Sequence, residues 1–136
     1  MTIQANVLNA GNANGPTLVL TEPLSFWGAF DPQSGMIVDV HHPQRGTKLA
    51  GKILLLTETR GSGGTPGGIA EAIRLGTGPL AIILIAPDIN LAIGAAVALA
   101  LYGKACPVLA VSAEHYATLT TCPTLTIDQQ GRVTWP

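Results

Sequence analysis

Three apolar runs in the second half of the chain are separated by two helix-like segments, and this alternation restricts the fold more than any other feature. The runs are KILLL at 52–56, LAIILIA at 80–86 and PVLAV at 107–111. The segments between them, 69–76 and 90–103, each end at a glycine, as many helices do. Strands that lack polar positions are buried on both faces, so this half predicts parallel strands covered by helices.

The first half of the chain has a different pattern, in which short strand-like runs are separated by Gly, Asn and Pro clusters. These runs lie at 3–8, 17–20 and 36–40. Such punctuation is typical of an antiparallel or barrel-like layer. A short helix at 113–119 and a hairpin at 124–135 are expected to complete the fold. The sequence therefore predicts an α/β protein, a single domain over residues 1–136 built as a three-layer β/β/α sandwich.

Composition excludes several classes of function. Lys and Arg number 7 and Asp and Glu number 8, so the net charge of -1 offers no basic surface for nucleic acid. Only 11% of residues are charged, and a surface so poor in charge often adjoins a protein partner. The N-terminus lacks a basic region followed by an apolar one, and Pro87 interrupts the longest apolar stretches. We therefore expect a soluble, cytoplasmic protein with no membrane segment.

The segment RGSGGTPGG at 60–68 lies where the strand at 52–56 passes into a helix. Open α/β sheets bind ligands beyond the carboxyl ends of their strands, where the next helix presents unpaired N–H groups and a partial positive charge. Glycines let the backbone approach an anion, and Pro66 suits a first helical turn. Backbone N–H groups near Ser62 could stabilise an alkoxide, the form in which serine is a strong base. The alternative is that Ser62 is an ordinary helix N-cap.

Known phosphate-binding motifs match this loop poorly. A Walker loop needs Lys where Ile69 follows Gly68, and the GxGxxG dinucleotide pattern is interrupted by Pro66. The loop also lacks the GxSxG pattern of a nucleophile elbow. The histidines lie outside the loop, at His41, His42 and His115. A phosphotransfer module, which needs a histidine on its mobile segment, is therefore disfavoured.

A second unusual segment, at 22–35, gathers three of the six aromatic residues of the chain. They are Phe26, Trp27 and Phe30. Aromatic side chains on a loop favour a protein contact surface, and the alternative is a loop that folds back to close the end of the barrel. The two adjacent histidines that follow would point to opposite faces of a strand, so we expect a surface or loop-anchoring role for them. The two cysteines, Cys106 and Cys122, are too few and too far apart to predict a metal site.

These segments together resemble the small subunit of the aconitase X family, and the resemblance covers nearly the whole chain. It is carried by PLSFWGAFDPQSG at 23–35, His42-Pro43, the glycines Gly46 and Gly51, Arg-Gly-Ser at 60–62 and IRLGTGPLAIIL at 73–84. The resemblance implies a swivelling β/β/α domain that pairs with a large subunit holding an iron–sulfur cluster. Together such subunits dehydrate a hydroxy acid. It also implies that Ser62, which follows Arg-Gly in the family motif, is the proton acceptor.

Within this resemblance the loop at 60–65 is the expected substrate site, and no metal ligand is expected on this chain. The substrate-binding residues expected beside Ser62 are Arg60, Gly61, Gly63, Gly64 and Thr65. Arg60 would bind a substrate carboxylate or, alternatively, remain solvated. Family members act on cis-3-hydroxy-L-proline or on phosphomevalonate, and the scarcity of cationic residues near the loop favours the amino acid. A non-catalytic swivelling or interaction module is a further alternative.

Overall fold

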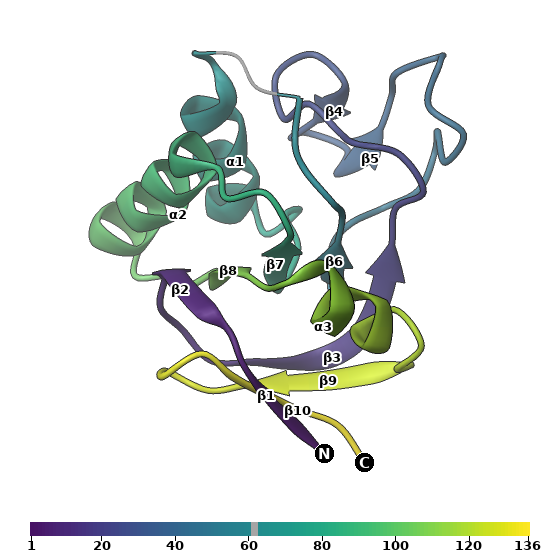
Figure 1. Ribbon diagram of the computed structural model, residues 1–136. Coiled ribbons are helices and arrows are strands. Elements are labelled where there is room, and N and C mark those ends of the chain that lie inside the picture. The colour runs from purple at the N-terminus through teal and green to yellow at the C-terminus, as the bar shows by residue number, and fades with distance from the viewer. Residues whose placement is uncertain (61–62) are drawn as a thin grey trace.

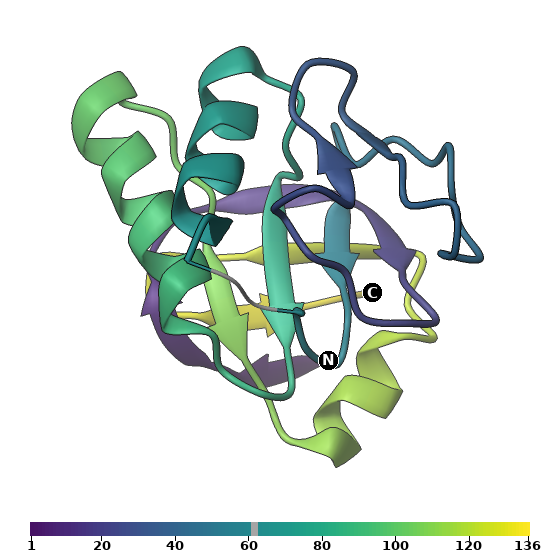
Figure 2. The same ribbon diagram turned by 90° about the horizontal axis from the view of Figure 1, so that it is seen from above.

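The computed structural model describes residues 1–60 and 63–136, and its main sheet is nearly closed into a barrel (Figure 1). The strands of this sheet are β1 (Thr2–Gln4), β2 (Asn6–Asn9), β3 (Ala13–Val19), β6 (Ile53–Leu55), β7 (Ala81–Leu84), β8 (Val108–Ala110), β9 (Thr124–Ile127) and β10 (Arg132–Thr134). Their order is β1-β10-β9-β3-β6-β7-β8-β2. Helices α1 (Thr65–Leu75) and α2 (Ile89–Tyr102) lie side by side against one face (Figure 2). The predicted alternation of strands and helices in the second half is confirmed.

Strands β3, β6, β7 and β8 are parallel neighbours, and β6, β7 and β8 are buried at every position, hence on both faces. In β6 and the residue after it, Leu54 and Leu56 pack into the core beneath the helices. The alternate residues Ile53 and Leu55 pack into a second core, between the two sheet layers. Because successive strand side chains point to opposite faces, two cores require apolar residues at every position. Each such side chain contributes roughly 1.5–3 kcal/mol through its burial.

The antiparallel layer closes the barrel at two places where the chain changes its pairing partner, within β3 and between β1 and β2. Residues 13–16 of β3 pair with β9, whereas residues 17–19 pair with β6. The predicted strand at 3–8 is divided at Ala5, because β1 pairs with β10 while β2 pairs with β8. The predicted C-terminal hairpin is confirmed as β9 and β10. The predicted short helix is α3 (Ala113–Leu119), which begins after the N-cap Ser112 and covers the core between the sheet layers.

The segment after β3 forms a small separate sheet, β4 (Phe30–Asp31) with β5 (Met36–Ile37). The predicted strand at 36–40 was wrong beyond Ile37. The backbone N–H groups of Val38 and Asp39 both donate to the carbonyl of Ala29, at 2.9 and 3.2 Å, so the ladder ends there. The chain then turns, and Val40 is 65% exposed.

Candidate functional site

The carboxyl ends of β6 and β7 hold the segment that leads into the glycine loop. The carbonyl of Thr57 accepts hydrogen bonds from the backbone N–H groups of Ile85 and Ala86, at 3.1 and 2.9 Å. On the other side, the N–H of Arg60 donates to the carbonyl of Leu24 at 3.0 Å. The segment 57–60 is therefore fixed from both flanks as far as the last described residue before the loop.

Asp88 joins this segment to the start of α2. Its Oδ1 accepts hydrogen bonds from the backbone N–H groups of Asn90 and Leu91, at 2.9 and 3.3 Å, which satisfies donors at the start of the helix. Its Oδ2 accepts a hydrogen bond from the hydroxyl of Thr59. One carboxylate thus fixes both the helix N-terminus and the base of the loop.

We expect Asp88→Ala to lower the free energy of unfolding by about 1–2 kcal/mol, because it removes a helix cap and leaves the Thr59 hydroxyl without its acceptor. Thr59→Val is the matched control, since it removes only the second interaction and should cost no more than about 1 kcal/mol. Urea unfolding followed by circular dichroism measures both values. An Asp88→Ala chain as stable as the wild type would contradict this role.

The predicted substrate loop lies between this edge and α1, and the structure describes part of it. Gly61 and Ser62 lie outside the described residues. Arg60 is exposed, and a Cβ at Gly63 would meet no described atom within 4 Å. Gly64 is the N-cap residue, Pro66 lies in the first turn as predicted, and Thr65 is fully buried. The predicted roles of Ser62 as proton acceptor and of Arg60, Gly61, Gly63, Gly64 and Thr65 in substrate binding stay predictions.

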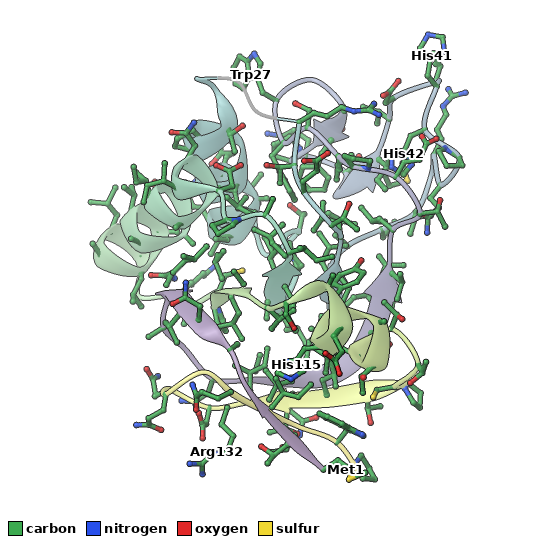
Figure 3. The ribbon with its side chains drawn as sticks, viewed as in Figure 1. Met1, Trp27, His41, His42, His115 and Arg132 are labelled. Carbon is green, nitrogen blue, oxygen red and sulfur yellow. The ribbon has the colours of Figure 1, made fainter. Side chains whose placement is uncertain are left out.

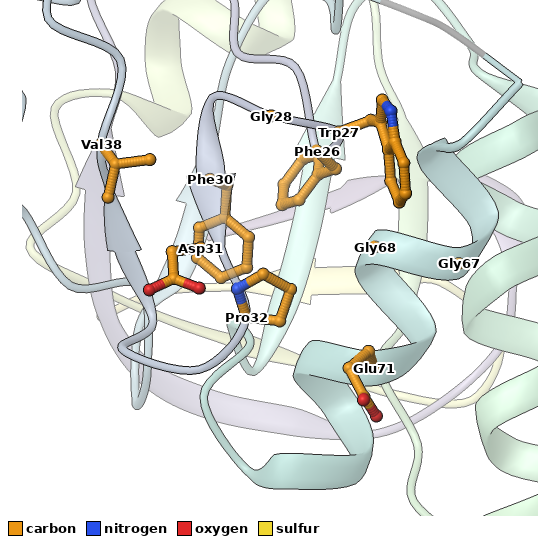
Figure 4. Close-up of a pocket in the computed structure, with 10 residues that line it drawn as sticks. All are labelled: Phe26, Trp27, Gly28, Phe30, Asp31, Pro32, Val38, Gly67, Gly68 and Glu71. Atoms are coloured by element: carbon orange, nitrogen blue, oxygen red, sulfur yellow. The ribbon is translucent and has the colours of Figure 1, made fainter.

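Two glycines allow the aromatic segment to approach α1 closely. A Cβ at Gly64 would lie 2.6 Å from Cγ of Trp27, and one at Gly68 would overlap the carbonyl oxygen of Phe26. Such separations are far below the 3.5–4.0 Å of favourable contact, so only glycine fits. Figure 4 shows the Trp27 indole beside the start of α1. These glycines therefore have a packing role that the anion-binding interpretation did not predict, because their partner lies about forty residues away in the sequence.

The aromatic segment divides between the two interpretations of its sequence. Phe26 and Phe30 are buried with their ring centroids 5.5 Å apart, so this part of the segment folds back as the alternative expected, but into the core beneath the helices and not into the end of the barrel. Trp27 is 63% exposed and remains a candidate contact residue. The buried His42 accepts a hydrogen bond from the N–H of Gln44 at 3.0 Å, which confirms a loop-anchoring role (Figure 3).

A pocket of about 810 Å³ lies between the aromatic segment and α1 (Figure 4). It is lined by Phe26, Trp27, Gly28, Phe30, Asp31, Pro32, Val38, Gly67, Gly68 and Glu71. A hydrogen bond from Arg74 lowers the pKa of Glu71, and hydrogen bonds from Ser34 and Gln33 lower the pKa of Asp31. Both carboxylates are therefore ionised at neutral pH, and each is hydrogen-bonded to residues close to it in sequence. The other residues that line the pocket are apolar side chains or glycines.

The described part of the chain contains no group of three or more His, Cys, Asp or Glu residues that could hold a metal ion. Cys106 and Cys122 are both buried and unpaired with each other, and burial raises the pKa of Cys106 to about 12. The side chains at the described positions therefore do not fit an iron–sulfur cluster. Among the helices of residues 1–60 and 63–136, none is long and apolar enough to cross a membrane.

Comparison with solved structures confirms the predicted fold. The chain superposes on Thermococcus kodakaraensis aconitase X in its holo-form with a TM-score of 0.83 and 24% sequence identity. The match covers 100% of this chain and 98% of that chain. This likeness shows that the chain shares the fold of that protein, a barrel-like sheet flanked by helices.

Curated relatives fall into two groups. The cis-3-hydroxy-L-proline dehydratase of Pseudomonas aeruginosa is 42% identical over 106 residues, which are 78% of this chain and 18% of that protein. The phosphomevalonate dehydratase small subunit of Methanothermobacter thermautotrophicus is 38% identical over 98 residues, 72% of this chain and 75% of that protein. The chain thus spans less than a fifth of the length of the hydroxyproline dehydratases that it matches. The model of the aconitase X swivel domain matches residues 2–135, and this chain therefore belongs to the aconitase X swivel domain family.

Proposed function

We propose that this chain is the small subunit of an aconitase X type dehydratase, active only with its large subunit, and that Ser62 accepts the substrate proton. One observation carries the proposal. The chain matches the swivel domain over residues 2–135, and its sequence has Arg60-Gly61-Ser62 between the carboxyl end of β6 and the start of α1. That edge is where an α/β sheet binds ligands, and curated relatives of this chain are named as a dehydratase and as a dehydratase small subunit.

The reaction requires a base at this edge. Removal of water takes a proton from the carbon beside the carboxylate, while the hydroxyl leaves the neighbouring carbon with its electron pair and a carbon–carbon double bond forms. Serine is a weak base unless its alkoxide is stabilised. The partial positive charge at the N-terminus of α1 and the main-chain amides of a glycine loop supply that stabilisation. Arg60 would orient the substrate carboxylate through its guanidinium.

Charge near the loop supports cis-3-hydroxy-L-proline as the substrate. A phosphorylated substrate needs several cationic ligands, and two of the candidates lie at the wrong end of the fold. Lys52 precedes β6, whereas the loop follows it, and Arg74 lies in the last turn of α1, paired with Glu71. Arg60 is the cation that directly precedes the Gly61-Ser62 pair.

We assign the iron–sulfur cluster to the large subunit, since the described residues of this chain offer no ligand set for it. The Methanothermobacter thermautotrophicus relative is named as a small subunit, and this name supports a two-subunit assembly. In the hydroxyproline dehydratases more than four-fifths of the chain lies outside the matched segment, which supports a need for a further, larger protein region. The substrate would then bind between the two subunits.

Co-expression of this chain with the aconitase X large subunit of the same genome, followed by assays of water loss, tests the proposal. We expect turnover of cis-3-hydroxy-L-proline at least about a hundredfold faster than that of phosphomevalonate, because the loop lacks phosphate ligands. Each subunit alone should be inactive. Preference for phosphomevalonate would overturn the substrate assignment, and a complex inactive on both substrates would contradict the dehydratase proposal.

A further inference from the structure

Helix α2 presents an outer face that is entirely apolar. The exposed side chains Ile89, Ile93, Val97 and Leu101 recur at every fourth position, and we call them the α2 stripe. Their exposed fractions run from 40% at Val97 to 69% at Ile89. The other exposed positions of the helix are Ala, Leu or Tyr, and no residue from 89 to 103 is charged.

The inner face of the same helix is also apolar, because it packs on α1. Gly94 makes this contact so close that a Cβ there would lie 2.6 Å from the carbonyl oxygen of Pro66. A helix that is hydrophobic all round belongs in the interior of a structure. Figure 2 shows α2 at the edge of the molecule, with α1 on its inner side. Within the described residues nothing covers the α2 stripe, so a further surface is needed to bury it.

The size and charge of the α2 stripe indicate which kind of partner covers it. A helix of 14 residues offers a face roughly 20 Å long and 10 Å wide, about a quarter of the ~800 Å² per partner that a stable interface needs. Pairing of two stripes in a dimer of this chain would therefore bury too little surface by itself. An interfacial membrane helix would carry Lys or Arg for lipid headgroups, and α2 has neither. A protein that also contacts another part of the chain fits better.

The α2 stripe begins at the edge of the proposed active site. Ile89 lines an open cleft with Thr59 and Asp88, the pair that fixes the base of the glycine loop. A subunit that covers the loop therefore meets the first residue of the stripe and can continue along the helix. In the hydroxyproline dehydratases, a further four-fifths of the chain is available to bury this surface.

We propose that the α2 stripe is the docking surface for the aconitase X large subunit, continuous with the face that carries the glycine loop. This inference rests on the proposed function, because it takes the large subunit as the partner. Docking along α2 would hold the domain beside its partner while the loop meets the substrate. The stripe therefore determines assembly, whereas Ser62 determines turnover.

Two charged substitutions in the α2 stripe, Ile93→Glu with Leu101→Glu, test the proposal against the purified large subunit. We expect the Kd of the complex, measured by titration calorimetry, to rise at least a hundredfold. The matched control is Val40→Glu, which charges a side chain of similar exposure in the turn after β5, outside α2, and should leave Kd within threefold of wild type. Should the glutamates disturb folding, Ile93→Ala with Leu101→Ala keeps good helix formers and should still raise Kd about tenfold.

The outcomes separate this inference from the proposed function. A wild-type chain that does not bind the large subunit would overturn both. Wild-type affinity in the folded glutamate and alanine variants would overturn only the docking surface. Sedimentation analysis of the chain alone tests whether a second copy of the chain covers the α2 stripe. If the wild type is a dimer that the glutamates dissociate, with affinity for the large subunit unchanged, a second copy occupies the stripe and the inference is wrong.

Discussion

Replacement of Gly68 by alanine should lower the free energy of unfolding by about 2–3 kcal/mol, a large effect for one methyl group. The added Cβ would overlap the carbonyl oxygen of Phe26 and lie 3.1 Å from its carbonyl carbon. Relief requires α1 and the aromatic segment to move apart, since the obstructing atoms belong to the backbone. Such movement would loosen the buried Phe26 and Phe30 and enlarge the pocket that both line. At this chain length the melting temperature should fall by roughly 8–12 °C.

The neighbouring glycine provides the matched control for this effect. A Cβ at Gly67 would meet no described atom within 4 Å, and the residue is exposed on the same helix. Gly67→Ala should therefore raise stability by about 0.5–1 kcal/mol, the ordinary gain of alanine over glycine in a helix. Thermal and urea unfolding of both variants compares the two residues under one set of conditions. Equal stabilisation by the two substitutions would contradict the close approach of Phe26 to Gly68.

The parallel half of the fold was predictable because its physical cause is visible in the sequence. Ile53, Leu54 and Leu55 are apolar in succession since each face of the strand meets a separate core. The strand at 36–40 was predicted too long, because apolar residues such as Val38 and Val40 continue past the point where the hydrogen-bond ladder ends. A pattern of apolar residues indicates which positions are buried, but it does not indicate where pairing with a neighbouring strand ends.

The position of the candidate loop between a strand and a helix was predictable from the sequence, but the packing of its glycines was not. The sequence interpretation was that the glycines of this segment let the backbone approach an anion. In the structure, Gly64 and Gly68 each leave space for a residue of the aromatic segment. Trp27 and Phe26 lie about forty positions earlier, so local sequence contains no signal for this contact. The Asp88 link to Thr59 was missed for the same reason, since it joins two loops that only the parallel sheet brings together.

Ser62→Ala should reduce kcat of the assembled complex by about a thousandfold. In the proposed mechanism Ser62 is the general base, which contributes roughly 10²–10⁴ to a rate and which alanine would remove. The KM should change much less, because the hydroxyl acts mainly in the transition state. Assembly should be unaffected, since the α2 stripe lies at residues 89–101 and does not include position 62. Ser62→Thr is the matched control, as it keeps a hydroxyl at this position and should retain measurable turnover.

A non-catalytic swivelling module, the alternative of a different class, makes the opposite prediction for the same variant. In that case the loop would only support the large subunit, and loss of one hydroxyl would leave kcat near its wild-type value. Stability and affinity measurements cannot separate the two accounts, because neither depends on proton transfer. The rate of the chemical reaction in a fully assembled complex does separate them.

The decisive measurement is therefore kcat for water loss from cis-3-hydroxy-L-proline, in wild-type and Ser62→Ala complexes matched for subunit occupancy and cluster content. A loss of about a thousandfold, with the Ser62→Thr complex partly active, is the result expected if the residue 62 hydroxyl takes the substrate proton. A Ser62→Ala complex that turns over within a few fold of the wild type would contradict it.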